Sequence, residues 1–252
     1  MNNSVYKPGK PSIAFQGEHG AFSEDAAIEL LGPALISRIE LKPCLTFAAL
    51  FRSIADGQAD YILLPVENSL IGLVQPANGL LQSSSLVVAG EVTIPIRHHL
   101  IGCPGTVFEE IEVVESHPAA LAQCKRFFAT HPRITPIATD DTAGSVSLII
   151  KRGNRKHAAI AGKRAAEIYG GAIIRSNIED DPDNHTRFLL LARESNKPIP
   201  GGLTKSEPGA VATGSSLSNK SLSGDIHPVA TAPGSDFVNP LRKNQGIEEH
   251  KS

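Results

Sequence analysis

Short apolar runs alternate with amphipathic segments along residues 12–193 of this 252-residue chain. Apolar runs of about four to eight residues bounded by polar turns are typical of buried strands, whereas apolar positions at three- and four-residue spacing predict helices. The predicted strands are residues 13–16, 39–41, 61–66, 87–100, 111–115, 134–138, 158–161, 172–176 and 187–192. The predicted helices are residues 22–31, 47–55, 119–128, 143–150 and 163–169. This alternation indicates an α/β fold with mostly parallel strands.

The predicted strand at residues 87–100 is longer than an ordinary strand of about five to six residues. We interpret it as a crossing from one lobe to another, with residues 187–192 as the returning strand. Residues 12–195 then form two lobes, one of residues 12–85 with 172–195 and one of residues 86–171. Ligand clefts form between such lobes, so we expect the site there.

The character of the chain changes from residue 196 onward. Ser, Gly and Pro become frequent, and apolar residues occur singly rather than periodically. A segment of this kind cannot bury enough apolar surface to offset the entropy lost on ordering. We therefore predict a disordered tail over residues 196–252.

Composition and charge argue against several classes of protein. Lys and Arg number 24 against 26 Asp and Glu, a formal charge of -2, so neither nucleic acid nor an anionic membrane is favoured as a partner. No run approaches the ~18 apolar residues of a membrane span, and residues 1–12 lack the pattern of a signal or transit peptide. The three cysteines are widely spaced without a CxxC pair, which favours reduced thiols. We expect a cytoplasmic protein.

Three predicted junctions between a strand and a helix carry small polar residues. They are Gly20 to Ser23, then Glu67, Asn68 and Ser69, then Asp141 with Thr142, Ala143, Gly144 and Ser145. Helix N-termini expose unpaired N–H groups and a partial positive charge, which suit a carboxylate. Ser23, Ser69 and Thr142 could instead be ordinary N-caps. Three such junctions together favour a cleft for a small molecule with more than one carboxylate.

A hydroxyl and a guanidinium stand side by side where the last predicted strand begins. Thr186 and Arg187 precede Phe188 and the apolar residues 189–192, and an acidic turn precedes them. A fixed cation and a hydroxyl suit an anionic substrate that loses or gains a proton. The same run could also be a plain turn that leads into a buried strand.

Three histidines lie at or inside predicted strands. His117 follows a strand and precedes Pro118, a good helix start, and could bind substrate or only the adjoining loop. His98 and His99 lie inside the long strand without a third ligand at a recognisable spacing, so we interpret them as structural. No metal site is predicted.

Taken together, these segments resemble the prephenate dehydratase family. The resemblance spans nearly all of residues 12–193. Its carriers are Gln16 to Ser23, Pro65 to Ser69 with Gly72, Glu115 to Pro118, Thr142 to Gly144, and Thr186 to Phe188. It implies an α/β fold of two lobes like type II periplasmic binding proteins, with the site in the interlobe cleft. It also implies a lyase that needs no cofactor and turns prephenate into phenylpyruvate in phenylalanine biosynthesis.

The resemblance also implies roles for individual residues. Thr186 would assist the leaving hydroxyl with Glu67 as the nearest candidate to reprotonate it, Arg187 would bind a carboxylate, and Phe188 would wall the ring. The amides of Asn68, Ser69 and residues 142–145 would take the other carboxylate. A cation that gripped the departing carboxylate would oppose its loss as carbon dioxide, so Arg187 could hold the pyruvyl carboxylate instead. The sequence leaves this choice open.

Three further expectations follow from the resemblance. The family usually continues into an ACT domain that binds phenylalanine, and the residues after 195 lack its periodicity, so we expect no feedback control within this chain. Arogenate dehydratases share the motifs and are the closest alternative, and a catalytically silent two-lobed binding module is a more distant one. Relatives are usually dimers or tetramers, and the oligomeric state is open here, with a homodimer as one option.

Overall fold

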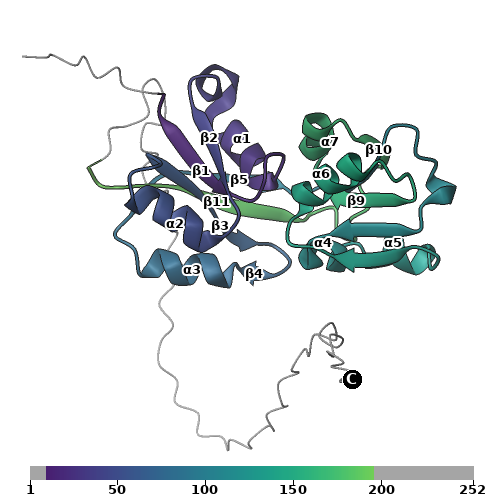
Figure 1. Cartoon of the computed structure of the whole chain (residues 1–252). Coiled ribbons are helices and arrows are strands. Elements are labelled where there is room, and N and C mark those ends of the chain that lie inside the picture. Colours follow the sequence, from purple (N-terminus) through teal and green to yellow (C-terminus); the bar gives the residue numbers. More distant parts are fainter. Residues whose placement is uncertain (1–9, 196–252) are drawn as a thin grey trace, which may run out of the picture. The chain divides into compact units, whose positions relative to one another are not determined.

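The computed structural model describes residues 10–195, and these form two α/β lobes (Figure 1). The disordered tail predicted over residues 196–252 lies outside the described residues. No helix within residues 10–195 is long and apolar enough to cross a membrane. The two-lobed α/β fold that the sequence predicts is confirmed.

The first lobe is built on a mixed sheet with the order β2-β1-β3-β11-β5. Its strands are β1 (Ser12–Gln16), β2 (Glu40–Cys44), β3 (Tyr61–Asn68), β5 (Val87–Pro95) and β11 (His185–Ala192), and the short β4 (Gly72–Leu73) pairs with β3. β1 runs parallel to β2 and β3, whereas β11 runs antiparallel to β3 and β5. In Figure 1, α1 (Phe22–Ile36) covers one face of this sheet, and α2 (Phe47–Ala55) and α3 (Gln75–Gln82) cover the other.

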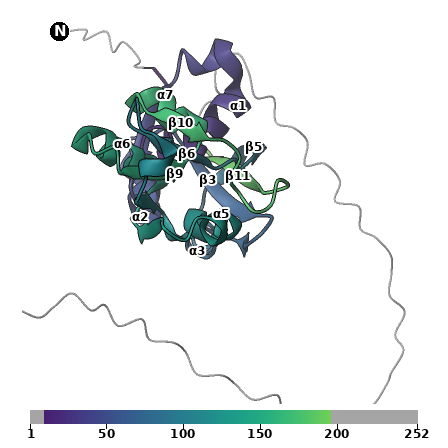
Figure 2. The ribbon, with the colours of Figure 1, turned by 90° about the vertical axis from the view of Figure 1, so that its right-hand side faces the viewer.

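The second lobe is built on a five-stranded sheet with the order β10-β6-β9-β7-β8. Its strands are β6 (His99–Gly102), β7 (Val113–Ser116), β8 (Thr135–Ala138), β9 (His157–Ala161) and β10 (Ala172–Arg175). The short helix η1 (Phe108–Glu110) precedes β7, and the helices are α4 (Pro118–Ala122), α5 (Lys125–Thr130), α6 (Thr142–Arg152) and α7 (Lys163–Tyr169). In the end-on view of Figure 2, α7 and β10 lie at the top of this lobe and α5 at the bottom.

Two connections join the lobes, but they are not the continuous crossing strands that the sequence predicts. The predicted strand at residues 87–100 breaks after Pro95, because β5 pairs with β11 in the first sheet and β6 pairs with β9 in the second. The placement of residues 172–176 in the first lobe was wrong. Ala172–Arg175 pairs antiparallel with β6, so the chain returns to the first lobe only after residue 175.

Some helices have the predicted bounds and others differ from them where polar residues, Gly or Pro break the apolar pattern. α2 and α7 have the predicted bounds. α1 runs past the predicted end at residue 31, with a kink at Gly32 and Pro33. The predicted helix at residues 119–128 is two short helices, and α3 was not predicted because Gln, Asn and Gly dilute its apolar face.

One face of the two lobes shares a single apolar core. Phe15 and Leu63 of the first sheet, Ile101 of the second, and residues of α1, α6 and α7 belong to the same buried cluster. The opposite faces have separate cores, one under α2 and α3 and one under α4 and α5. Gly20, at φ 87°, permits the close approach, since a Cβ there would lie 2.8 Å from the Cα of Ala165. The lobes are therefore packed together on the α1 side.

Candidate active site

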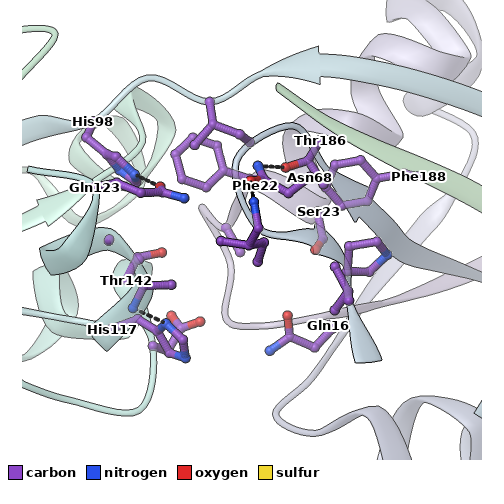
Figure 3. A pocket seen from close by; sticks show the side chains of 18 of the residues that line it. Gln16, Phe22, Ser23, Asn68, His98, His117, Gln123, Thr142, Thr186 and Phe188 are labelled. Atoms are coloured by element: carbon purple, nitrogen blue, oxygen red, sulfur yellow. Dashed lines mark hydrogen bonds between the residues drawn. The ribbon is translucent and has the colours of Figure 1, made fainter. Parts of the chain in front are cut away.

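A cleft of about 210 Å³ lies between the lobes (Figure 3). The first lobe contributes the N-terminal turn of α1 and the facing ends of β3 and β11, and the second contributes α4 and the start of α6. Six of the polar residues that line it are Gln16, Ser23, Asn68, Gln123, Thr142 and Thr186. The cleft stands where the sequence predicts a site.

Alternate residues of β11 face different surroundings. Thr186 and Phe188 are buried and line the cleft. Arg187 lies between them, and successive side chains of a strand point to opposite faces. Its guanidinium therefore lies outside the cleft, 3.2 Å from Glu67 Oε2 and 3.6 Å from Glu91 Oε2. Of the predicted catalytic residues, the structure brings Thr186 and Phe188 to the cleft and pairs Arg187 with Glu67 elsewhere.

The side chain of Asn68 anchors Thr186. The two N–H groups of Asn68 Nδ2 are shared among three acceptors, which are Thr186 Oγ1 at 2.9 Å, Asn184 Oδ1 at 2.8 Å and the carbonyl of His185 at 3.0 Å. Asn68 Oδ1 accepts from the amides of Leu70 and Ile71. Because the Thr186 oxygen accepts this bond, its own proton is free to be donated into the cleft.

The predicted helix start at Glu67, Asn68 and Ser69 was wrong. β3 continues to Asn68 and turns into β4, because these residues pair with β11 and β4. The Ser69 amide donates to the His185 carbonyl, and the Ser69 hydroxyl accepts from the His185 amide at 3.0 Å. Ser69 thus fastens β11 to this turn and does not line the cleft. Its amide is not free for a carboxylate.

The start of α6 is a helix N-terminus as predicted, but a protein side chain caps it. Asp141 Oδ1 accepts from the Gly144 amide at 2.6 Å, and the Asp141 carbonyl accepts from the amide and the hydroxyl of Ser145. Ala143 is fully buried in the shared core. Of residues 142–145, only Thr142 lines the cleft.

Ser23 and His117 both line the cleft. Ser23 lies in the first turn of α1, where the N-cap Ala21 has no side chain that could bond the free amides. His117 is the N-cap of α4, and its Nδ1 accepts from the Ala119 amide at 3.2 Å. The two interpretations of His117 from the sequence are thus compatible, since it caps a helix and also borders the cleft.

Gln123 was missed by the sequence reasoning. It follows α4 and lines the cleft, and its Oε1 lies 2.7 Å from His98 Nε2 and 3.2 Å from Asn184 Nδ2. The available signal was a single amide within the otherwise apolar and basic residues 119–128. That signal alone does not separate a cleft residue from a helix end. The bond to Asn184 links Gln123 to Asn68 and Thr186 in one network. Figure 3 shows two of the bonds around the cleft, between His98 and Gln123 and between Asn68 and Thr186.

The side chains that line the cleft in the described part of the chain include no Lys or Arg. Asp140 and Asp141 are the acidic residues among them. His98 also lines the cleft, and burial lowers the pKa of its imidazole from the usual value, so the ring is neutral near pH 7. Residues 10–195 also hold no group of three or more His, Cys, Asp or Glu side chains placed to bind a metal. An anion would be bound here by hydroxyl, amide and backbone N–H groups.

Comparison with known proteins decides the family. The sequence model of prephenate dehydratase matches residues 13–196. This chain belongs to the prephenate dehydratase family. It is 39% identical over 194 residues to arogenate dehydratase/prephenate dehydratase 2 of Arabidopsis thaliana, which covers 77% of this chain and 49% of that protein.

Two further family members match a similar share of this chain. The bifunctional chorismate mutase/prephenate dehydratase of Enterobacter agglomerans is 33% identical, over 73% of this chain and 47% of that protein. The structure of prephenate dehydratase from Arthrobacter aurescens in complex with L-Phe is 27% identical with a TM-score of 0.66, over 74% of this chain and 62% of that chain. The chain spans about half the length of the curated relatives it matches.

Proposed function

We propose that this chain catalyses the decarboxylating dehydration of prephenate to phenylpyruvate in phenylalanine biosynthesis. The observation that carries the proposal is Thr186, which is buried at the cleft and whose oxygen accepts from Asn68. Family membership and the prephenate dehydratases among its relatives support the choice of substrate.

The reaction needs one proton and no redox partner. The bond from the ring to its carboxylate breaks, and that electron pair enters the ring as a new double bond. The bond from the ring to its hydroxyl breaks at the far side, and the oxygen departs with its pair and takes up a proton to become water. Prephenate dianion and one proton thus give phenylpyruvate anion, carbon dioxide and water. The ring becomes aromatic, which supplies the driving force.

Thr186 assists the departing hydroxyl in this scheme. Its proton is donated toward the leaving oxygen, and the negative charge that develops on its own oxygen is stabilised by the N–H group of Asn68. Glu67 has no part in this scheme, since its carboxylate is paired with Arg187 on the other side of the strand pair. In this scheme Thr186 takes its proton back from solvent water that enters the cleft.

The absence of Lys and Arg from the described cleft lining suits a decarboxylation. A cation held against the departing carboxylate would stabilise the charge that must leave as neutral carbon dioxide, and would raise the barrier. In this scheme the anion is bound by the neutral donors of Gln123 and Thr142 and by the first-turn amides of α1. These groups attract a carboxylate less strongly than a Lys or Arg side chain would. Arg187, paired with Glu67 and Glu91 outside the cleft, holds neither carboxylate in this scheme.

Arogenate, the transaminated form of prephenate, is the second candidate substrate. It is supported by relatives such as arogenate dehydratase 3 of Arabidopsis thaliana, 42% identical over 183 residues and 72% of this chain. Prephenate carries a keto group where arogenate carries an ammonium group, and the acidic Asp140 and Asp141 border the cleft. The homodimer and the cytoplasmic location expected from the sequence stay predictions.

The test is to follow phenylpyruvate formation from prephenate and phenylalanine formation from arogenate by the purified chain. The proposal expects a larger kcat/KM with prephenate. A larger kcat/KM with arogenate selects the alternative, and no product from either substrate contradicts both. Thr186→Val serves as the control for contaminating activity.

A further inference from the structure

His98 lies in the first connection between the lobes and is held from three sides. It is 2% exposed, its amide donates to Glu179 Oε2 at 2.8 Å, and its carbonyl accepts from the Ile178 amide at 2.9 Å. The ring of Phe22 meets the imidazole edge-on, with centroids 5.6 Å apart. Both rings line the cleft (Figure 3). The backbone of His98 is therefore fixed by two hydrogen bonds, and Phe22 packs against its ring.

Backbone groups determine how the whole amide network is oriented. Asn68 Oδ1 faces the amides of Leu70 and Ile71, which can only donate, so Asn68 Nδ2 faces the other way. That nitrogen also meets the His185 carbonyl, which can only accept. Asn184 must then present Oδ1 to Asn68, which turns Asn184 Nδ2 toward Gln123.

The network also determines the orientation of Gln123 and the tautomer of His98. Gln123 must present an oxygen to the donor Asn184 Nδ2, and His98 Nε2 lies 2.7 Å from that same oxygen. An acceptor on both sides of this contact would repel, so His98 Nε2 carries a proton. With its oxygen held by two donors, Gln123 has its NH2 group left for the cleft.

We propose that His98 is a positioning residue, which donates from Nε2 to Gln123 and thereby fixes the Gln123 NH2 group toward the substrate. The proposal rests on the proposed function only for the identity of that substrate. Without the His98 donor, the Gln123 side chain would be held through Asn184 alone, at the longer distance of 3.2 Å.

The second imidazole nitrogen explains why the ring stays neutral. His98 Nδ1 is buried and has no hydrogen-bond partner within residues 10–195. A proton added there would place a charged N–H group in a buried position without an acceptor, which is costly. Burial accordingly lowers the pKa of His98, and the bond to Gln123 opposes this shift without overcoming it. The donor to Gln123 is thus present on a neutral ring.

Matched variants separate this role from simple packing. His98→Gln places an amide nitrogen the same number of bonds from Cβ as Nε2, so it should keep kcat within about threefold. His98→Met fills similar space without a donor, and His98→Asn has a donor that is too short. Both should lower kcat by about 10- to 100-fold, the cost of a misplaced group, with KM changed less than about threefold. The proposal is overturned if His98→Met keeps wild-type kcat or if His98→Gln is no better than His98→Met.

A double-variant comparison tests whether His98 acts through Gln123. In a Gln123→Ala background there is no side-chain amide for His98 to hold in place, so adding His98→Met should lower kcat by less than about twofold. An additive loss would mean that His98 acts on the substrate directly, which contradicts the proposal. Thermal unfolding of each variant shows whether it is folded under the assay conditions.

A measurement without substrate distinguishes failure of this proposal from failure of the proposed function. Long-range proton and nitrogen-15 correlation of the histidine rings should show His98 in the neutral form with its proton on Nε2, and Gln123→Ala should disturb this signal. A proton on Nδ1 overturns the proposal, whatever the activity. The expected tautomer together with no turnover of prephenate or arogenate would instead remove the proposed function and leave the network as described.

Discussion

The two sides of the β3 and β11 pair carry different kinds of interaction. On the cleft side, the buried Asn68 and Thr186 join a network of amides and a hydroxyl. On the opposite side, Arg187 forms ion pairs with Glu67 and Glu91, whose side chains are about half exposed. The register pairs Thr186 with Asn68 on the cleft side and Arg187 with Glu67 on the opposite side. Residues that are adjacent along each strand therefore lie on different sides.

Thr186 and Arg187 are adjacent in one sequence motif, but their side chains make different interactions on opposite sides of the sheet. A buried hydrogen bond lost without replacement costs about 1 to 3 kcal/mol, whereas an exposed ion pair contributes about 0 to 1 kcal/mol. A single substitution on the cleft side should therefore have the largest effect on activity and stability. Substitutions of the ion-paired residues on the opposite side should have small effects.

The largest effect is expected from Thr186→Val, which keeps the shape of the side chain and removes the hydroxyl. Loss of the donor to the leaving oxygen should lower kcat by about 10²- to 10⁴-fold, with little change in KM, because general acid assistance acts in the transition state. Steady-state kinetics with prephenate measure this. Thr186→Ser, which keeps the donor, should stay within about tenfold of the wild type, and equal kcat values for the Val and Ser variants would remove Thr186 from the chemistry.

The next largest effect is expected from Asn68→Asp. The substitution keeps the size of the side chain but places a carboxylate oxygen against Thr186 Oγ1, Asn184 Oδ1 and the His185 carbonyl, all of which accept from Asn68 now. We expect kcat to fall by about 10²-fold and the free energy of unfolding to fall by about 2 to 3 kcal/mol. Kinetics and denaturant unfolding measure the two effects.

Asn78→Asp is the matched control for Asn68→Asp. Asn78 Nδ2 donates to the carbonyls of Val66 and Val74 and lies outside the cleft lining. This control should lose stability while kcat stays within about threefold of the wild type. If both variants lost stability and neither lost kcat, the Asn68 network would serve the fold alone.

The fold follows from the sequence where apolar periodicity and length agree. Residues 47–55 and 163–169 form helices with the predicted bounds, because strong patterns are bounded there by clear turn residues. Strand partners are a different matter. Residues 172–176 read as a strand from their composition, but only tertiary packing decides that Ala172–Arg175 joins β6 in the second sheet.

The site was predicted in part. The alternation of side chains along a strand could have shown that Arg187 points away from the cleft. The side that Arg187 takes was implied by the alternation along residues 185–192, in which Thr186, Phe188 and Leu190 share one face. The partner Glu67 was not implied, since it requires the register of β3 with β11. The contact between Gln123 and His98 could not be predicted, because it joins the end of α4 to the connection between the lobes, and only tertiary packing brings these segments together.

A smaller effect is expected from Asp25→Asn, which tests a charge outside the cleft at the contact between the lobes. Burial raises the pKa of Asp25 from 3.8 to about 6, against the attraction of Arg164. The folded protein then holds this proton more tightly than the unfolded chain, so the contribution to stability is present below about pH 4 and is lost as the pH rises through about 6.

The variant should therefore equal the wild type near pH 4 and exceed it above pH 7. The gain in the free energy of unfolding should be about 1 kcal/mol, less than the full shift implies, because a third of the side chain is exposed. Denaturant unfolding at the two pH values measures it, and Asp56→Asn at an exposed helix end is the control. A wild type that is more stable than the variant at high pH would mean that the pair with Arg164 outweighs burial.

The smallest effect is expected from Arg187→Gln, although the sequence places this residue in the substrate site. Its ion pairs are exposed, so the free energy of unfolding should change by less than about 1 kcal/mol, and kcat and KM should stay within about threefold. Glu67→Gln is the matched partner, and a double-variant cycle with Arg187→Gln should give a coupling of about 0.2 to 1 kcal/mol that weakens in high salt. A KM raised more than about tenfold in Arg187→Gln, with KM lowered in Glu67→Gln, would mean that Glu67 holds back a cation which otherwise reaches the substrate. The guanidinium of Arg187 would then have two positions, one paired with Glu67 outside the cleft and one at the substrate.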